Sequence, residues 1–194
     1  MPMKAIELLA PAKDFACGKA AVDHGADAVY IGGPVFGARA AAGNPLADIA
    51  RLADYSHRYR AKVYLTLNTI LFDHELEDAR NLARQAWDAG VDALIIQDMG
   101  LLELDLPPLP LIASTQMHNL DGGHIRFLEK VGFQRAILAR ELSLEEIRSI
   151  REQTTIELEA FVHGSLCVSY SGRSYLSYTL GGRSANRGNC GQPC

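Results

Sequence analysis

Short apolar runs alternate along this chain with longer segments in which apolar residues return every three or four positions. A short apolar run is typical of a buried strand, and the longer spacing is typical of a helix that packs on one face. The pattern therefore predicts alternating strands and helices, with strands at 5–10, 28–32, 62–68, 92–97, 109–115, 136–139 and 156–162.

The segments between the predicted strands carry signals for the beginning and end of helices. Asp14 is suited to cap a helix, Pro45 to open one, and Ser143 with Glu146 matches a capping box. Glycines before three of the strands fit the left-handed residue that commonly ends a helix. We predict helices at 14–25, 45–59, 73–89, 99–102, 123–131 and 143–153.

Strict alternation of strands and helices indicates an α/β protein built from parallel βα units. Seven units suggest a TIM-like barrel in which the eighth strand is missing, because a complete barrel has eight. The chain would then be truncated, completed by a partner, or an open barrel. A doubly wound open sheet is the alternative, but no Gly-rich phosphate loop follows the first strand. We expect residues 1–163 to form the incomplete barrel and 164–194 an irregular Cys-containing segment of the same domain.

Composition narrows the functional classes only slightly. A chain of 194 residues with 48% hydrophobic residues is long enough for one domain with a sizeable core. The net charge of −4 excludes a global basic footprint for nucleic acid. We see no signal peptide and no membrane span, so we expect a cytoplasmic protein with no membrane contact. Thiols stay reduced in the cytoplasm, so the four cysteines indicate ligands or buried thiols.

Polar residues gather where the predicted strands end, which is where a barrel places its chemistry. Any one of them can equally be a loop cap or a buried hydrogen-bonding group. As a set they suit a polar, planar substrate. The set consists of Tyr30, Asn68, Gln97, Asp98, Ser114, Thr115, Gln116, Arg140, Glu141 and His163.

The last part of the chain, residues 164–194, is rich in Gly, Ser and Asn and has no clear period. It holds three of the four cysteines, and no Asp or Glu follows Glu159. Cys190 and Cys194 are spaced to reach one metal or cluster, and Cys167 can join them. Three thiolates suit a [4Fe–4S] cluster with one open iron, whereas zinc would use a fourth ligand such as His163. The fourth cysteine, in the first helix, reads as a small buried thiol.

Peptidase chemistry has little support in the residues themselves. The sequence contains no His-Glu-x-x-His and no Gly-x-Ser-x-Gly motif. Cys167 with the nearby His163 is the one arrangement that resembles a nucleophile and its base.

The chain resembles the U32 peptidase family, also called collagenase-like proteases. The resemblance extends over the whole chain and includes Leu67-Asn68, Ser114-Thr115-Gln116 and Asn186-Arg187-Gly188. It is strongest to the branch that forms 5-hydroxycytidine in 23S ribosomal RNA. The signature reads Glu159-x-Phe161-x-x-Gly164-Ser165-Leu166-Cys167-x4-Gly172-x-Ser174-x-Leu176-Ser177.

This resemblance implies a TIM-like domain, RNA hydroxylation, a cysteine-bound [4Fe–4S] cluster and prephenate as a co-substrate. Cys167, Cys190 and Cys194 match family cysteines, and Ser174 stands where the signature usually has Cys. We expect catalytic roles for Asn68, Gln116, Arg140, Glu141 and His163. We expect substrate contacts from Tyr30, Arg39, Gln97, Asp98, Ser114, Thr115, Arg173, Arg183 and Arg187, with the arginines holding phosphates.

Three hypotheses follow from the sequence. The first is an RNA-modifying hydroxylase that acts on ribosomal RNA. The second is a peptidase that uses Cys167 or a bound metal. The third is an inactive fragment that needs a partner, or the missing C-terminal part, to complete its barrel.

Overall fold

The computed structural model describes residues 6–165 and 167–194. Ala5 of the first predicted strand and Leu166 of the signature lie outside these residues. Within the described part, the strands form one parallel sheet in chain order. They are β1 (Leu9–Ala12), β2 (Ala28–Gly32), β3 (Lys62–Leu67), β4 (Ala93–Ile96), β5 (Leu111–Ala113), β6 (Arg135–Ile137) and β7 (Glu157–Glu159).

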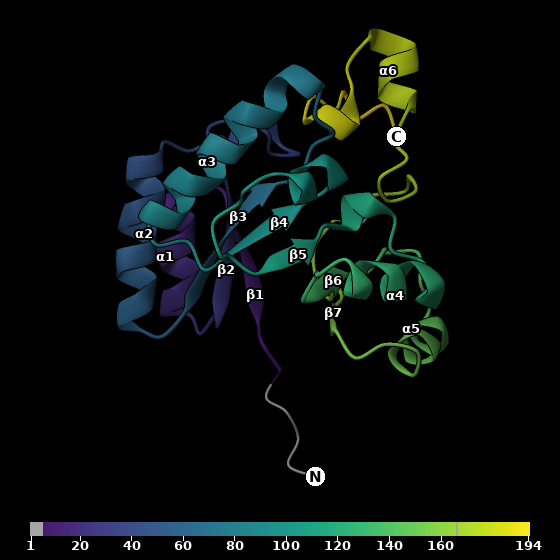
Figure 1. Cartoon of the computed structure of the whole chain (residues 1–194), viewed down its shortest axis with the longest axis horizontal. Coiled ribbons are helices and arrows are strands. Elements are labelled where there is room, and N and C mark those ends of the chain that lie inside the picture. Colours follow the sequence, from purple (N-terminus) through teal and green to yellow (C-terminus); the bar gives the residue numbers. More distant parts are fainter. Residues whose placement is uncertain (1–5, 166) are drawn as a thin grey trace.

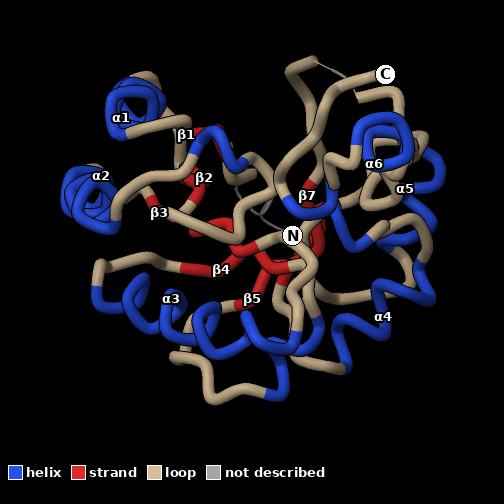
Figure 2. The backbone as a smooth tube through the Cα atoms, turned by 90° about the horizontal axis from the view of Figure 1, so that it is seen from above, coloured by secondary structure: helices blue, strands red, loops and turns tan. Residues whose placement is uncertain are grey.

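The helices lie on the outer side of this curled sheet (Figures 1 and 2). Five of them lie between strands, and a sixth follows β7 in the described chain. Between β4 and β5, where the sequence predicts a helix at 99–102, the described chain has a 3-10 helix, Met99–Glu103. The six α-helices are α1 (Phe15–Asp23), α2 (Leu46–Arg58), α3 (Leu76–Asp88), α4 (Gly122–Lys130), α5 (Leu144–Arg151) and α6 (Leu176–Gly181). This is a TIM-like barrel in which the described chain supplies seven of eight strands.

Two apolar clusters lie on the two faces of the sheet, and only one of them includes helix residues. The larger cluster joins strand residues such as Val63 and Leu65 to helix residues such as Leu52 and Leu82. The smaller one contains only strand residues, among them Tyr64 and five others with side chains on the opposite face. Neighbouring residues of a strand point to opposite faces, so the smaller cluster fills the inside of the barrel.

The predicted helix signals are confirmed. The carboxylate of Asp14 accepts a hydrogen bond from the Cys17 amide at 2.9 Å, and Ser143 and Glu146 form the capping box. Gly25 and Gly90 have φ values of 95° and 83°, as expected for residues that end a helix. Polar capping atoms and glycines therefore mark the helix ends that the sequence indicates.

Several boundaries differ from the prediction. Pro11 does not end the first strand but lies within β1, which pairs only with β2 in the described sheet. Proline is tolerated there because an edge strand needs fewer backbone donors. The last strand ends at Glu159 and not at residue 162, where the apolar side chains are exposed. Helix α6 in the predicted irregular segment was missed.

The expectation for the fourth cysteine was wrong. Cys17 is exposed, because α1 turns Gly18 and Val22 inward instead. Among the described residues, no helix has the length and apolar character needed to cross a bilayer.

Candidate functional site

Three strand ends are joined by a hydrogen-bond network at the carboxyl edge of the sheet. Asn68, directly after β3, donates from Nδ2 to Ser114 Oγ at 3.3 Å. The same hydroxyl, directly after β5, accepts from the Gln116 amide at 3.2 Å. Gln97, directly after β4, donates from Nε2 to the Gln116 carbonyl at 3.2 Å. The structure thus brings together four of the predicted site residues.

A second network links the end of β6 to the segment after β7. Ser171 Oγ lies 3.4 Å from Arg140 Nη2, which donates to it, and donates to Glu141 Oε2 at 2.9 Å. Its amide also donates to Glu141 Oε1. Burial acts to raise the pKa of Glu141, but hydrogen bonds from Ser171 outweigh it, and the pKa lies below its ordinary value. The carboxylate therefore stays charged at neutral pH beside Arg140.

The two networks meet where the segment after β7 folds over β5. Gly172 has a φ of 73°, and a Cβ there would lie 2.0 Å from the Gln116 carbonyl oxygen. The adjacent Ser171 is buried, and its carbonyl contacts His118 Nδ1 at 2.8 Å. The carboxyl ends of the strands surround the open end of the barrel, which we call the mouth. Residues 171–172 form one wall of this mouth. We call the two networks together the mouth network: Asn68, Gln97, Ser114, Gln116, Arg140, Glu141 and Ser171.

Sequence reasoning missed Ser171 and His118. Ser171 is one of several serines in a stretch without periodicity, and no motif in the sequence around His118 marks it as part of a site. Their roles depend on a contact across 53 residues of chain, which no local pattern reports.

Two atoms of the mouth network stand out because they are buried without a hydrogen-bond partner in the described chain. One is an acceptor, Gln97 Oε1, and the other is a donor, Arg140 Nε. Buried polar atoms are nearly always paired, so these two are the unused hydrogen-bonding groups of the mouth network.

Other predicted residues are held by local structure. The two carboxylate oxygens of Asp98 accept from the amides of Leu71 and Gly100, both at 2.8 Å. Thr115 Oγ1 donates to the Leu138 carbonyl at 3.3 Å. Both side chains thus fix loops of the mouth, and their predicted contact with a substrate is untested.

Arg135 and Glu159 form an ion pair inside the barrel, below the mouth. Burial raises the pKa of Glu159 above its ordinary value, although Arg135 Nη1, 3.3 Å from Oε2, opposes the shift. Burial, followed by the charge of Glu159, also raises the pKa of Tyr30. The predicted substrate residue Tyr30 is therefore half-buried and protonated at neutral pH, so its hydroxyl can donate a hydrogen bond.

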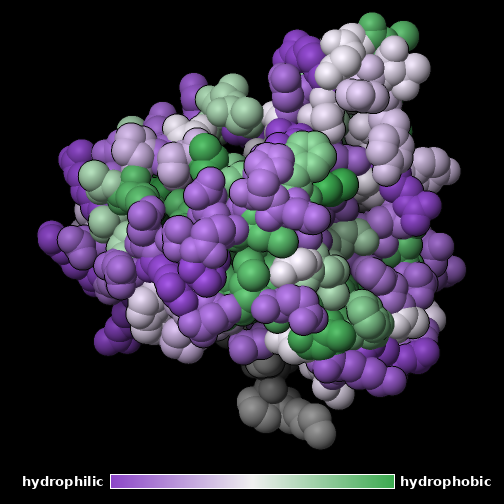
Figure 3. All heavy atoms as spheres, turned by 45° about the horizontal axis from the view of Figure 1, so that its top comes forward, coloured by the Kyte–Doolittle hydropathy of each residue, from purple (hydrophilic) through white to green (hydrophobic). Residues whose placement is uncertain are grey.

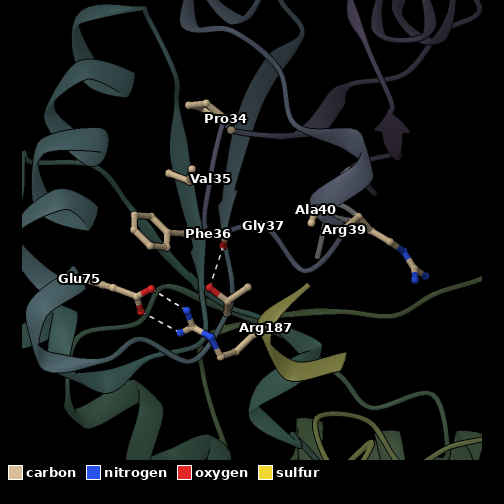
Figure 4. Close-up of a pocket in the computed structure, with 10 residues that line it drawn as sticks. Pro34, Val35, Phe36, Gly37, Arg39, Ala40, Glu75 and Arg187 are labelled. Carbon is tan, nitrogen blue, oxygen red and sulfur yellow. Dashed lines mark hydrogen bonds and ion pairs between the residues drawn. The ribbon is translucent and has the colours of Figure 1, made fainter. Parts of the chain in front are cut away.

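A cavity of about 260 Å³ lies beside the mouth, between the loop after β2 and residues 185–187 (Figure 4). Arg187 forms two hydrogen bonds with Glu75, at 2.6 and 2.8 Å, and its predicted contact with phosphate stays a prediction. These bonds lower the pKa of Glu75 to about 2. The guanidinium of Arg39 lies on the other side of the cavity and is directed away from this pair (Figure 4).

Backbone contacts fix the chain around Arg187 to the barrel. The Asn186 carbonyl accepts from the Ile70 amide at 3.1 Å, and the Gly188 carbonyl accepts from the Ala40 amide at 3.0 Å. The Arg187 guanidinium also lies 4.3 Å from the centre of the Phe72 ring. Residues 186–188 are thus docked between the loops that follow β2 and β3, and we call them the docked segment.

The thiols do not form a ready-made metal site. Cys167 and Cys190 are half-buried, and Cys194 is exposed, as is His163. In the described part of the chain, no three His, Cys, Asp or Glu side chains gather where they could hold a metal ion. Ser174 Oγ donates to Ser169 Oγ at 2.8 Å. Binding of a cluster by the three cysteines therefore remains a prediction.

Comparison with known proteins places the chain in a family. The profile of peptidase family U32 matches residues 13–194. The 23S rRNA 5-hydroxycytidine synthase of Escherichia coli is 56% identical over 97% of this chain and 29% of its own length. The tRNA hydroxylation protein P of the same organism is 36% identical over 97% of this chain and 43% of its own length. The chain thus spans less than half the length of these relatives.

A solved structure supports the fold. The structure of a U32 peptidase superposes with a TM-score of 0.67 and 16% identity, covering 82% of this chain and 70% of that one. At this identity the likeness concerns the fold alone, and it confirms the TIM-like barrel. The family resemblance expected from the signature is likewise confirmed, and the chain belongs to peptidase family U32.

Proposed function

We propose that this chain is the barrel domain of an RNA-modifying hydroxylase, and that its substrate is a cytidine of 23S ribosomal RNA. The names of the two relatives with hydroxylation functions support this reading. The structural observation that carries it is the pair of buried, unpartnered atoms in the mouth network, Gln97 Oε1 and Arg140 Nε.

These two atoms suit the edge of a pyrimidine base. The Watson–Crick edge of cytosine presents an amino donor next to a ring acceptor, so Gln97 Oε1 would accept from the amino group and Arg140 Nε would donate to the ring. Bases read in this way are unstacked and unpaired. Glu141, which is charged, holds Ser171 and offsets the charge of Arg140 without occupying its Nε.

The redox part of the reaction rests on the resemblance alone. Replacing the C5 hydrogen of cytidine by a hydroxyl group is a two-electron oxidation, for which a [4Fe–4S] cluster and prephenate remain predicted cofactor and co-substrate. The hydrogen bonding proposed for the base does not depend on either. Iron and acid-labile sulfide analysis of protein purified without oxygen tests the cluster.

The test of the proposed function is nucleoside mass spectrometry of ribosomal RNA from cells that lack their own 5-hydroxycytidine synthase and express this chain. We expect 5-hydroxycytidine with the unaltered chain and about tenfold less with Arg140→Lys, which keeps the charge but removes Nε. Arg126→Lys, on the outer surface of α4, is the matched control and should leave the yield unchanged. An equal yield with Arg140→Lys and with the unaltered chain would contradict the role proposed for Arg140 Nε. Ribosomal RNA without 5-hydroxycytidine in the presence of the unaltered, folded chain would favour the third hypothesis over an active hydroxylase.

Peptidase activity is the second candidate, favoured by the name of the family and of its solved member. It would use Cys167 as nucleophile, although no contact among the described residues joins Cys167 to the exposed His163. Release of peptides from fluorescent casein, abolished by Cys167→Ala, would support it. The third hypothesis is a barrel that needs a completing partner or further chain. If a partner copy completes the barrel, light scattering should show an oligomer, and a lone monomer would argue against such a partner.

A further inference from the structure

The segment after β7 carries a row of exposed aromatic side chains. Tyr170, Tyr175 and Tyr178 are 67%, 62% and 61% exposed. Tyr178 lies on α6, Tyr175 directly precedes this helix, and Tyr170 comes five residues before Tyr175. Helix α6 stands out from the barrel in Figure 1 and forms the projection at the upper right of Figure 3. Exposed tyrosines grouped in this way have no role in the core, so their rings are available to a partner.

The chain segment that carries these rings has charged side chains of one sign only. Residues 160–194 contain three arginines and no Asp, Glu or Lys, although the whole chain has a net charge of −4. Arg187 is neutralised by Glu75, which leaves Arg173 and Arg183, both exposed. Arg183 donates only to neutral acceptors, Asn189 Oδ1 at 3.2 Å and the Cys190 carbonyl at 3.3 Å. We call Tyr170, Tyr175, Tyr178, Arg173 and Arg183 the patch: its own charges are positive, and the carboxylate of Glu141, bound to Ser171, lies beside it.

This patch is physically continuous with the mouth network. The Arg173 amide donates to the Tyr170 carbonyl at 3.1 Å, which closes a turn around the buried Ser171. The hydroxyl and amide of Ser171 are bound to Glu141 in the mouth. The Tyr170 ring meets the His118 ring edge-on, with the ring centres 6.5 Å apart. A strand lying on the patch would therefore lead into the mouth.

We propose that Tyr170, Tyr175 and Tyr178, with Arg173 and Arg183, form a stacking surface for single-stranded RNA next to the mouth. The inference rests on the proposed function and names the surface that would guide the strand. Aromatic rings stack on bases whose faces are free, and arginines meet the phosphates between them. A duplex hides its base faces and fits poorly. A second copy of the chain would bring two positive patches together, which disfavours a dimer through this surface.

The experiment measures fluorescence anisotropy of a labelled single-stranded oligocytidine titrated with the full chain. We expect Tyr175→Ala combined with Tyr178→Ala to weaken binding about tenfold or more, since stacking on aromatic rings typically contributes that much per base. The corresponding Phe variants keep the ring and should bind within about twofold. Tyr59→Ala is the matched control, because Tyr59 is also 61% exposed but lies at the end of α2. Thermal unfolding should be unchanged in the Tyr175 and Tyr178 variants, whereas Tyr59→Ala also loses a ring contact with Tyr55.

The arginines have a separate signature. Arg173→Gln combined with Arg183→Gln should reduce the slope of log Kd against log salt by about 1.4, roughly 0.7 for each phosphate contact with a single strand. The same oligonucleotide annealed to its complement should bind the unaltered chain more weakly.

Three results of the binding and sedimentation experiments would overturn the stacking surface. They are unchanged binding by the tyrosine double variant, tighter binding of the duplex, and a dimer in sedimentation that the double variant abolishes without loss of RNA binding. The proposed function fails separately. Expected binding without any 5-hydroxycytidine would argue against an active hydroxylase and leave the surface intact. A normal yield of 5-hydroxycytidine with the tyrosine double variant would refute the stacking surface and leave the hydroxylase intact.

Discussion

The pairing of Arg187 with Glu75 predicts that one ion pair controls the exposure of Cys190. Removing the pair by Arg187→Ala takes away two charge-assisted hydrogen bonds and the contact with the Phe72 ring. The side chains of Arg187 and Glu75 are 31% and 16% exposed, so solvent screens the pair only partly. We estimate a loss of about 1–2 kcal/mol in the docking of this segment, or roughly a 5- to 30-fold rise in its undocked population.

Alkylation of the thiols, followed by peptide mass spectrometry, measures this population. Cys190 lies two residues after the docked segment and is half-buried, so its rate of alkylation should rise about tenfold in Arg187→Ala and in Glu75→Gln. Cys17 is exposed on α1 and serves as an internal reference with an unchanged rate. Asp105→Asn, which removes the exposed pair of Asp105 with Arg84, is the matched control.

The outcome that refutes this reasoning is specific. If Cys190 reacts in Arg187→Ala and in Glu75→Gln at the same rate as in the unaltered chain, and overall thermal stability is unchanged, the ion pair does not hold the docked segment. The backbone bonds to Ile70 and Ala40 would then be sufficient by themselves.

Three further predictions concern the loops and strand ends that surround the mouth and the docked segment. Gly188→Ala should destabilise the protein by about 1–3 kcal/mol in thermal unfolding, because a Cβ there would lie 2.3 Å from a backbone oxygen at a φ of 79°, whereas Gly181→Ala, with open space around it, should not. Asn119→Ala should cost about 2–4 kcal/mol in urea unfolding, because its buried amide donates to three carbonyls between β5 and β6; an effect below about 0.5 kcal/mol would contradict this. The pKa of Glu75, lowered from 4.5 to about 2, means that the stabilisation is present above pH 4.5 and lost as the pH falls through about 2. Exchange of the Ile70 amide, relative to amides of β3, should therefore accelerate over this range in the unaltered chain but not in Glu75→Gln.

Much of the candidate site could be predicted once the strands had been located. Asn68, Gln97 and Ser114 each follow a buried apolar run, and parallel strands place their carboxyl ends at one edge. The structure joins these residues in one network, as that rule predicts. The boundaries of β1 and β7 were less predictable, because a proline and an exposed apolar run both depend on whether a neighbouring strand is present.

The sequence by itself determined the order of the strands and helices up to β7, the helix caps and the family, because these depend on residues close together in the chain. Only the tertiary structure decided that Ser171 closes the mouth and that Arg187 pairs with Glu75, 112 residues away. Periodicity reports which face of an element is buried, but it carries no information on which distant polar groups become partners. Those partners follow from how the loops after the strands fold over one another.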